Sequence, residues 1–118
     1  MKISELADVL DARILCCAEN ADKEVCSACG SDMMSDVLAY VKNQAVLLTG
    51  LVNPQVIRTA EMMDMCCIVF VRSKKPTEEM IRLAENADIV VLTTDQRMYE
   101  ACGHLYANGL DGKRKNDV

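Results

Sequence analysis

The period of the hydrophobic pattern changes several times along the chain, and each change predicts a new element. Apolar residues at positions 3, 6, 7 and 10 follow helical spacing, with Ser4 as the expected N-cap. Short strands are expected over residues 12–17 and 24–28, with a polar turn between them. Gly30-Ser31-Asp32 then leads into a helix over residues 33–41. The buried stripe of that helix is expected to consist of Met34, Val37, Leu38 and Val41.

Beyond residue 44, apolar runs alternate with helical patterns. The runs at residues 45–49, 66–71 and 88–92 are mostly apolar, as in strands that are buried on both faces of a parallel sheet. Asn53-Pro54 is typical of a helix start, because a capping side chain is followed by a proline at the first helical position. Pro76-Thr77-Glu78-Glu79 is expected to open another helix, with acidic residues at its positive end. Thr93-Thr94-Asp95 is expected to cap a last helix, which ends at Gly109.

This order of elements predicts an α/β fold. We expect a single three-layer domain with a mostly parallel sheet of about four to five strands and helices on both faces. A length of 118 residues fits one such domain. The domain is expected to span residues 1–110, and residues 111–118, which include three consecutive basic residues, to form a flexible charged tail.

The composition indicates in which compartment the protein is expected and which classes of partner it is not expected to bind. The chain carries seven cysteines, an odd number, and includes the adjacent pairs Cys16-Cys17 and Cys66-Cys67. With no secretory signal pattern before them, free thiols in a reducing cytoplasm are expected rather than a disulfide framework. No apolar stretch approaches the ~20 residues of a membrane span. The net charge of −5 argues against a nucleic-acid partner, which needs a basic face.

Small polar residues follow each predicted parallel strand. In an open parallel sheet ligands bind beyond the carboxyl ends of the strands, where helix N-termini favour an anion. Arg72 adds a positive charge there. Helix capping alone also accounts for these residue types, and no phosphate-binding glycine motif marks a nucleotide. The candidate ligand-binding residues are Gly30, Ser31, Asp32, Thr49, Gly50, Asn53, Arg72, Thr93, Thr94 and Asp95.

The single C-x-x-C motif, Cys26-Ser27-Ala28-Cys29, supports an alternative. Such spacing serves zinc or an iron–sulfur cluster, and Cys102 and His104 are the remaining ligands at short spacing. His104 has no nucleophile placed beside it by any recognised spacing. The sequence therefore predicts no catalytic residues and no cofactor. A metal site at these residues is the alternative to the ligand-binding site at the strand ends.

The order of these residues resembles the DRTGG domain family. The resemblance runs through Gly30 to Val37, Leu48-Thr49-Gly50 with Asn53, Cys67 to Phe70, Pro76 to Ala84 and Thr94, and spans roughly residues 1–110. Related domains occur beside CBS-domain pairs, in phosphate acetyltransferases, and in a fold shared with the N-terminal domain of HPr kinase/phosphorylase. The signature pentapeptide itself is not retained, since Cys26-Ser27-Ala28-Cys29-Gly30 stands near its place.

The resemblance implies a bacterial, non-enzymatic module that serves in regulation or assembly and is often dimeric. Together with the strand ends, it predicts a sensor that binds a small anionic metabolite or nucleotide, or a protein partner. We also expect a homodimer formed through residues 30–40, because Met33-Met34 places an apolar side chain off the face that must contact the sheet.

Overall fold

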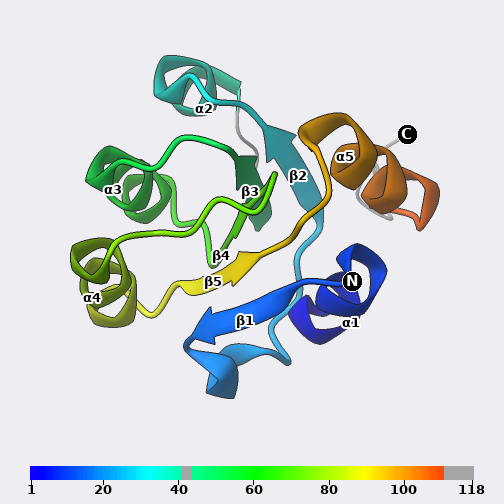
Figure 1. The fold of residues 1–118 in the computed structure, drawn as a ribbon, viewed down its shortest axis with the longest axis horizontal. Coiled ribbons are helices and arrows are strands. Elements are labelled where there is room, and N and C mark those ends of the chain that lie inside the picture. Colours follow the sequence, from blue (N-terminus) through cyan, green and yellow to red (C-terminus); the bar gives the residue numbers. More distant parts are fainter. Residues whose placement is uncertain (41–43, 111–118) are drawn as a thin grey trace.

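The computed structural model describes residues 1–40 and 44–110. Val41 and the predicted tail at residues 111–118 lie outside these described residues. Five strands form one sheet in the order β1-β5-β4-β3-β2. Strands β2 to β5 run parallel, while β1 pairs antiparallel with β5 (Figure 1). The strands are β1 (Arg13–Cys16), β2 (Ser27–Gly30), β3 (Ala45–Thr49), β4 (Cys67–Phe70) and β5 (Val90–Thr93).

Helices cover both faces of the sheet, as the sequence predicts. One face carries α2 (Met34–Tyr40), α3 (Pro54–Met62) and α4 (Glu78–Asn86), and the other carries α1 (Ile3–Leu10) and α5 (Met98–Ala107), as Figure 1 shows. Strands β2 to β5 follow one another in sequence order, and crossovers of one hand place the three connecting helices on the same face. A short 3-10 turn (Ala18–Asn20) follows β1.

The apolar runs of the sequence are explained by two side-chain clusters, one on each face of the sheet. Along β3 and β4, Leu48 and Val69 belong to the cluster beneath α1 and α5, whereas Leu47 and Phe70 belong to the cluster beneath α2 to α4. Every residue of β3, β4 and β5 is buried. This two-sided burial is the reason why these strands show no polar alternation.

Several predicted boundaries are wrong at the N-terminal half. Helix α1 begins at Ile3 with Lys2 as its N-cap, so Ser4 lies inside the helix. The second strand is Ser27–Gly30 rather than 24–28, and Glu24 forms only an isolated bridge with Lys2. In α2, Val37 is fully buried, but Leu38 is 43% exposed and is not part of a buried stripe.

Among the described residues, no helix is long and apolar enough to cross a bilayer. All seven cysteines lie in the described part of the chain, and all are free thiols.

Candidate functional site

The carboxyl ends of the parallel strands meet at one edge of the sheet and bring polar side chains together there. The residues after β2 reach the end of β3, where Ser31 N–H donates to the Leu48 carbonyl at 3.0 Å. Asp32 follows directly. It therefore lies beside Thr49 and Gly50, although 17 residues separate it from Thr49.

Asp32 is the centre of a polar cluster, which we call the Asp32 network and which consists of Asp32, Thr49, Gly50 and Arg72. Oδ1 of Asp32 accepts a hydrogen bond from Gly50 N–H at 2.7 Å and another from Thr49 Oγ1 at 3.1 Å. Oδ2 lies 3.8 Å from Nη2 of Arg72. One carboxylate thus receives a backbone donor, a hydroxyl donor and a cation, three groups that also bind phosphate.

Arg72 is positioned by an unusual turn. Arg72 and Ser73 both adopt left-handed backbone conformations, with φ of 57° and 60°. Their N–H groups donate to the carbonyls of Gln96 at 2.8 Å and Thr94 at 2.9 Å, and these bonds hold the turn against the end of β5. Two consecutive non-glycine residues in this region cost roughly 1–2 kcal/mol each, so the surrounding contacts must maintain the turn.

Gly50 accommodates the Arg72 guanidinium. A Cβ atom at position 50 would come within 3.1 Å of Cζ and 3.2 Å of Nε of Arg72. Only glycine leaves room for the guanidinium to pack against the backbone at the end of β3.

A polar pocket of about 270 Å³ lies next to this network, at the ends of β4, β5 and β1. We call it the strand-end pocket. Ser73 Oγ donates to Oδ1 of Asp95 at 2.6 Å, and Thr93 Oγ1 donates to the Lys74 carbonyl at 2.7 Å. The pocket is lined by Asp11, Arg13, Ser73, Lys75, Thr93, Thr94 and Asp95.

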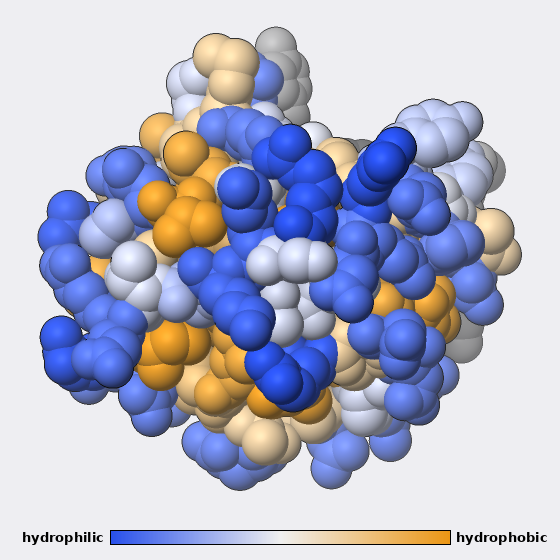
Figure 2. Space-filling view, viewed as in Figure 1, coloured by the Kyte–Doolittle hydropathy of each residue, from blue (hydrophilic) through white to orange (hydrophobic). Residues whose placement is uncertain are grey.

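Two cations in this pocket, Arg13 and Lys75, form no ion pair with any residue that the structure describes. Within residues 1–40 and 44–110, the ion pairs are that of the Met1 amino group with Glu24 and that of Arg72 with Asp32. Arg13 and Lys75 are both exposed and form neither. Viewed from the same direction as Figure 1, hydrophilic residues run across the middle of the molecular surface, and apolar residues show to the left of it and below it (Figure 2).

Three predicted site residues have structural contacts instead. Gly30 packs against α5, where a Cβ would lie 2.7 Å from the Cys102 sulfur. Ser31 Oγ accepts from Met33 N–H at 3.0 Å, just before α2. Asn53 caps α3 by accepting from Gln55 N–H at 2.8 Å.

Thr93-Thr94-Asp95 does not cap α5 as predicted. Thr93 ends β5, and the N-cap of α5 is Arg97. The N–H of Arg97 donates to the Glu100 carboxylate at 3.4 Å. Thr94 is buried and donates to the Leu10 carbonyl at 2.7 Å, which ties the end of α1 to the end of β5.

Sequence reasoning missed Asp11, Arg13 and Lys75. Arg13 begins β1, and β1 runs antiparallel to β5, so its amino end lies at the carboxyl edge of the other strands. The position of Arg13 depends on the direction of β1 in the sheet, and the local sequence pattern does not reveal that direction.

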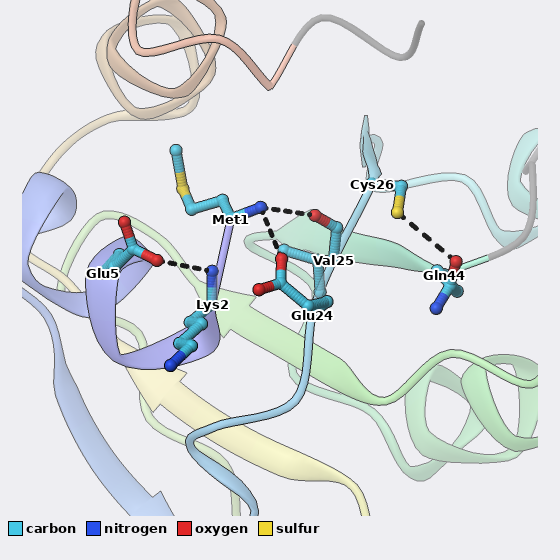
Figure 3. Close-up of polar contacts among 7 residues, drawn as sticks. All are labelled: Met1, Lys2, Glu5, Glu24, Val25, Cys26 and Gln44. Atoms are coloured by element: carbon cyan, nitrogen blue, oxygen red, sulfur yellow. Dashed lines mark hydrogen bonds and ion pairs between the residues drawn. The ribbon is translucent and has the colours of Figure 1, made fainter. Parts of the chain in front are cut away.

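The residues of the predicted metal alternative are not brought together. The Cys26 thiol donates to Oε1 of Gln44 at 3.3 Å (Figure 3). Cys29 packs with the cluster beneath α2 to α4, whereas Cys102 packs with the cluster beneath α1 and α5. His104 Nδ1 lies 2.8 Å from Oε1 of Gln96. In the described part of the chain, no three His, Cys, Asp or Glu side chains are grouped to hold a metal ion.

Comparison with known families decides the classification of the chain. The model of the DRTGG domain matches residues 5–107. The chain belongs to the DRTGG domain family. The sequence-based resemblance is thereby confirmed, and the match covers every described helix and strand from β1 to α5.

A solved structure supports the DRTGG fold. The CBS and DRTGG domains of the regulatory region of Clostridium perfringens pyrophosphatase, in complex with the activator diadenosine tetraphosphate, match with a TM-score of 0.72 at 16% identity. The match covers 99% of the present chain and 52% of that chain, so this DRTGG domain spans about half the length of its structural neighbour. No curated protein matches the chain.

Proposed function

We propose that this DRTGG domain is a non-catalytic regulatory module that binds a small anionic ligand in the strand-end pocket. The observation that carries the proposal is a pocket at the carboxyl ends of parallel strands that contains two cations, Arg13 and Lys75, neither of which forms an ion pair within the described part of the chain. The chain has a net charge of −5, whereas in this pocket the two cations balance the charges of Asp11 and Asp95, so the pocket is less acidic than the chain as a whole. A phosphate group would satisfy both cations.

Phosphorylated metabolites and nucleotides are the ligand class that this chemistry favours. Thr93 and Ser73 place hydroxyl groups at the pocket wall, and Arg72 directly precedes Ser73 in the sequence. The pyrophosphatase regulatory region binds diadenosine tetraphosphate as an activator, which makes nucleotides with several phosphates the first probes for this chain.

Thermal-shift measurements with inorganic phosphate, AMP, ATP and diadenosine tetraphosphate test the proposal. A ligand at 100 times its Kd stabilises a protein by about 2.7 kcal/mol, which corresponds to a rise in Tm of roughly 10 °C for a domain of this size. The Arg13→Ala/Lys75→Ala double variant is expected to lose more than half of that rise.

The matched control is the Arg58→Ala/Arg82→Ala double variant. It removes the same charge from exposed positions on α3 and α4, outside the pocket. Its Tm rise should equal that of the wild type. Equal losses in both double variants, or no shift with any of the four probes, would refute the proposed ligand site.

We further propose that the domain forms a homodimer through residues 30–40. Met33 is 62% exposed and Leu38 is 43% exposed, so the start of α2 presents apolar side chains to solvent. Asp32 and Asp36 are exposed beside them and would form a polar rim.

A further inference from the structure

We infer that the Asp32 carboxylate occupies a second phosphate subsite and is displaced when the ligand binds. The subsite consists of Thr49, Gly50 and Arg72, and the inference rests on the proposed ligand site in the neighbouring pocket. It assigns the ligand to molecules that carry a chain of at least three phosphates, with the two ends of the chain in the two subsites.

The geometry of the Asp32 network supports a role for the Asp32 carboxylate as an internal competitor of phosphate. Its three donors come from the ends of β3 and β4, and all converge on a side chain that arrives from beyond β2. The backbone N–H of Gly50 donates at 2.7 Å, the shortest of the three contacts. A phosphate oxygen could take the place of Oδ1 and retain the same donors.

The exposure of the network permits this exchange. The side chains of Arg72 and Asp32 are 50% and 51% exposed, and their charged atoms are 3.8 Å apart. An exposed ion pair at this distance contributes little to stability. A doubly charged phosphate can therefore replace a singly charged carboxylate without disrupting the core beneath it.

The fold also links the two subsites. Arg72 reaches the Asp32 network, and the next residue, Ser73, lines the strand-end pocket. β3 and β5 are separated only by β4, and neighbouring strands lie about 4.8 Å apart, so the subsites are about 10 Å apart. A chain of three or four phosphates extends over most of this distance, whereas a single phosphate or a pyrophosphate does not.

The test compares Asp32→Asn with wild type in calorimetric titrations with ATP, inorganic pyrophosphate and AMP. Asparagine retains an oxygen for Gly50 N–H and Thr49 but removes the competing charge. We expect the variant to bind ATP roughly 5- to 10-fold more tightly, and to bind pyrophosphate and AMP, which are too short to reach both subsites, with unchanged affinity. Arg72→Ala is expected to weaken ATP binding by a similar factor.

Asp36→Asn is the matched control, because it removes one negative charge from an exposed position on α2 outside the network. It should change ATP affinity by less than twofold. An equal gain in Asp36→Asn and Asp32→Asn would overturn the inference, since both would then reflect net charge alone. So would a gain for AMP as large as that for ATP.

The outcomes separate this inference from the proposed function. If wild type binds ATP through Arg13 and Lys75 but Asp32→Asn binds no more tightly, the competitor role is wrong and the ligand site stands. If neither wild type nor Asp32→Asn binds any probe, both are wrong. Amide spectra give an independent readout, because displacement of Asp32 should shift the Gly50 N–H resonance on ATP addition.

Discussion

At the scale of single residues, the thiols are the groups whose protonation the fold changes most. Burial raises the pKa of the Cys67 thiol well above its usual range, and the adjacent Cys66 adds to this effect. Burial is also the main cause that raises the pKa of Cys17 to about 12, assisted by the neighbouring Cys16. These thiols remain neutral in the folded protein at neutral pH, as expected for cysteines that serve as small apolar side chains.

The buried thiols predict a loss of stability at alkaline pH. Above about pH 9 the unfolded chain loses thiol protons that the folded chain retains at Cys67, so the free energy of unfolding falls as pH rises. The slope is up to about 1.4 kcal/mol per pH unit for each such thiol. Urea unfolding at pH 8, 9 and 10 should show this slope in the wild type and a smaller slope in Cys67→Ala.

Val69→Ala provides the control for this experiment, because it truncates a buried residue in the same strand and the same cluster without removing a thiol. It should lower stability equally at all three pH values. A slope in Cys67→Ala identical to that of the wild type would contradict the assignment.

At the scale of elements, helix starts were predicted correctly where a side chain caps the first turn. Asn53 and Thr77 accept hydrogen bonds from the N–H groups of Gln55 and Met80, and α3 and α4 begin directly after them. The same residue types at Thr93 to Asp95 instead bond within the loop and to distant carbonyls. Short polar side chains stabilise caps and turns equally well, so their identity alone does not locate a helix start.

The capping role of Asn53 gives a prediction that separates structure from ligand binding. Asn53→Ala should lower the free energy of unfolding by about 1 kcal/mol, or roughly 4 °C in Tm, and leave ATP affinity unchanged. Thr77→Ala, the cap of α4, is the comparison and should behave alike. A fall in ATP affinity in Asn53→Ala but not in Thr77→Ala would place Asn53 in the ligand site.

At the scale of the whole molecule, the fold class followed from the sequence but the sheet order did not. The buried runs and the helices between them predicted the parallel strands β3 to β5 and helices on both faces. The candidate residues Thr94 and Asp95 meet Ser73 in one pocket because strand ends share an edge. Arg13 was missed because its position depends on a pairing with Thr93, far along the chain, which no local pattern encodes.

The proposed homodimer is tested at the same scale. Light scattering at micromolar concentration should give twice the 13.0 kDa mass of one chain. Met33→Asp places a charge in the expected interface and should shift the mass toward that of the monomer. Met62→Asp makes the same change at a side chain that is 69% exposed on α3 and should leave the dimer intact. A monomeric wild type, or dissociation by both variants, would contradict the interface.

The pairing of β1 with β5 has a consequence for the order in which the protein folds. Leu10 lies shortly before β1 and Thr94 directly after β5. A hydrogen bond joins these two residues, which are 84 positions apart. Closing so long a loop carries an entropic cost, and contacts at such sequence separation form slowly. Asp11 and Arg13 therefore reach Thr93 and Asp95 only after β5 has been synthesised. A folding intermediate in which β1 has not yet paired with β5 would therefore have no complete strand-end pocket, and the proposed ligand would bind only after this pairing has formed.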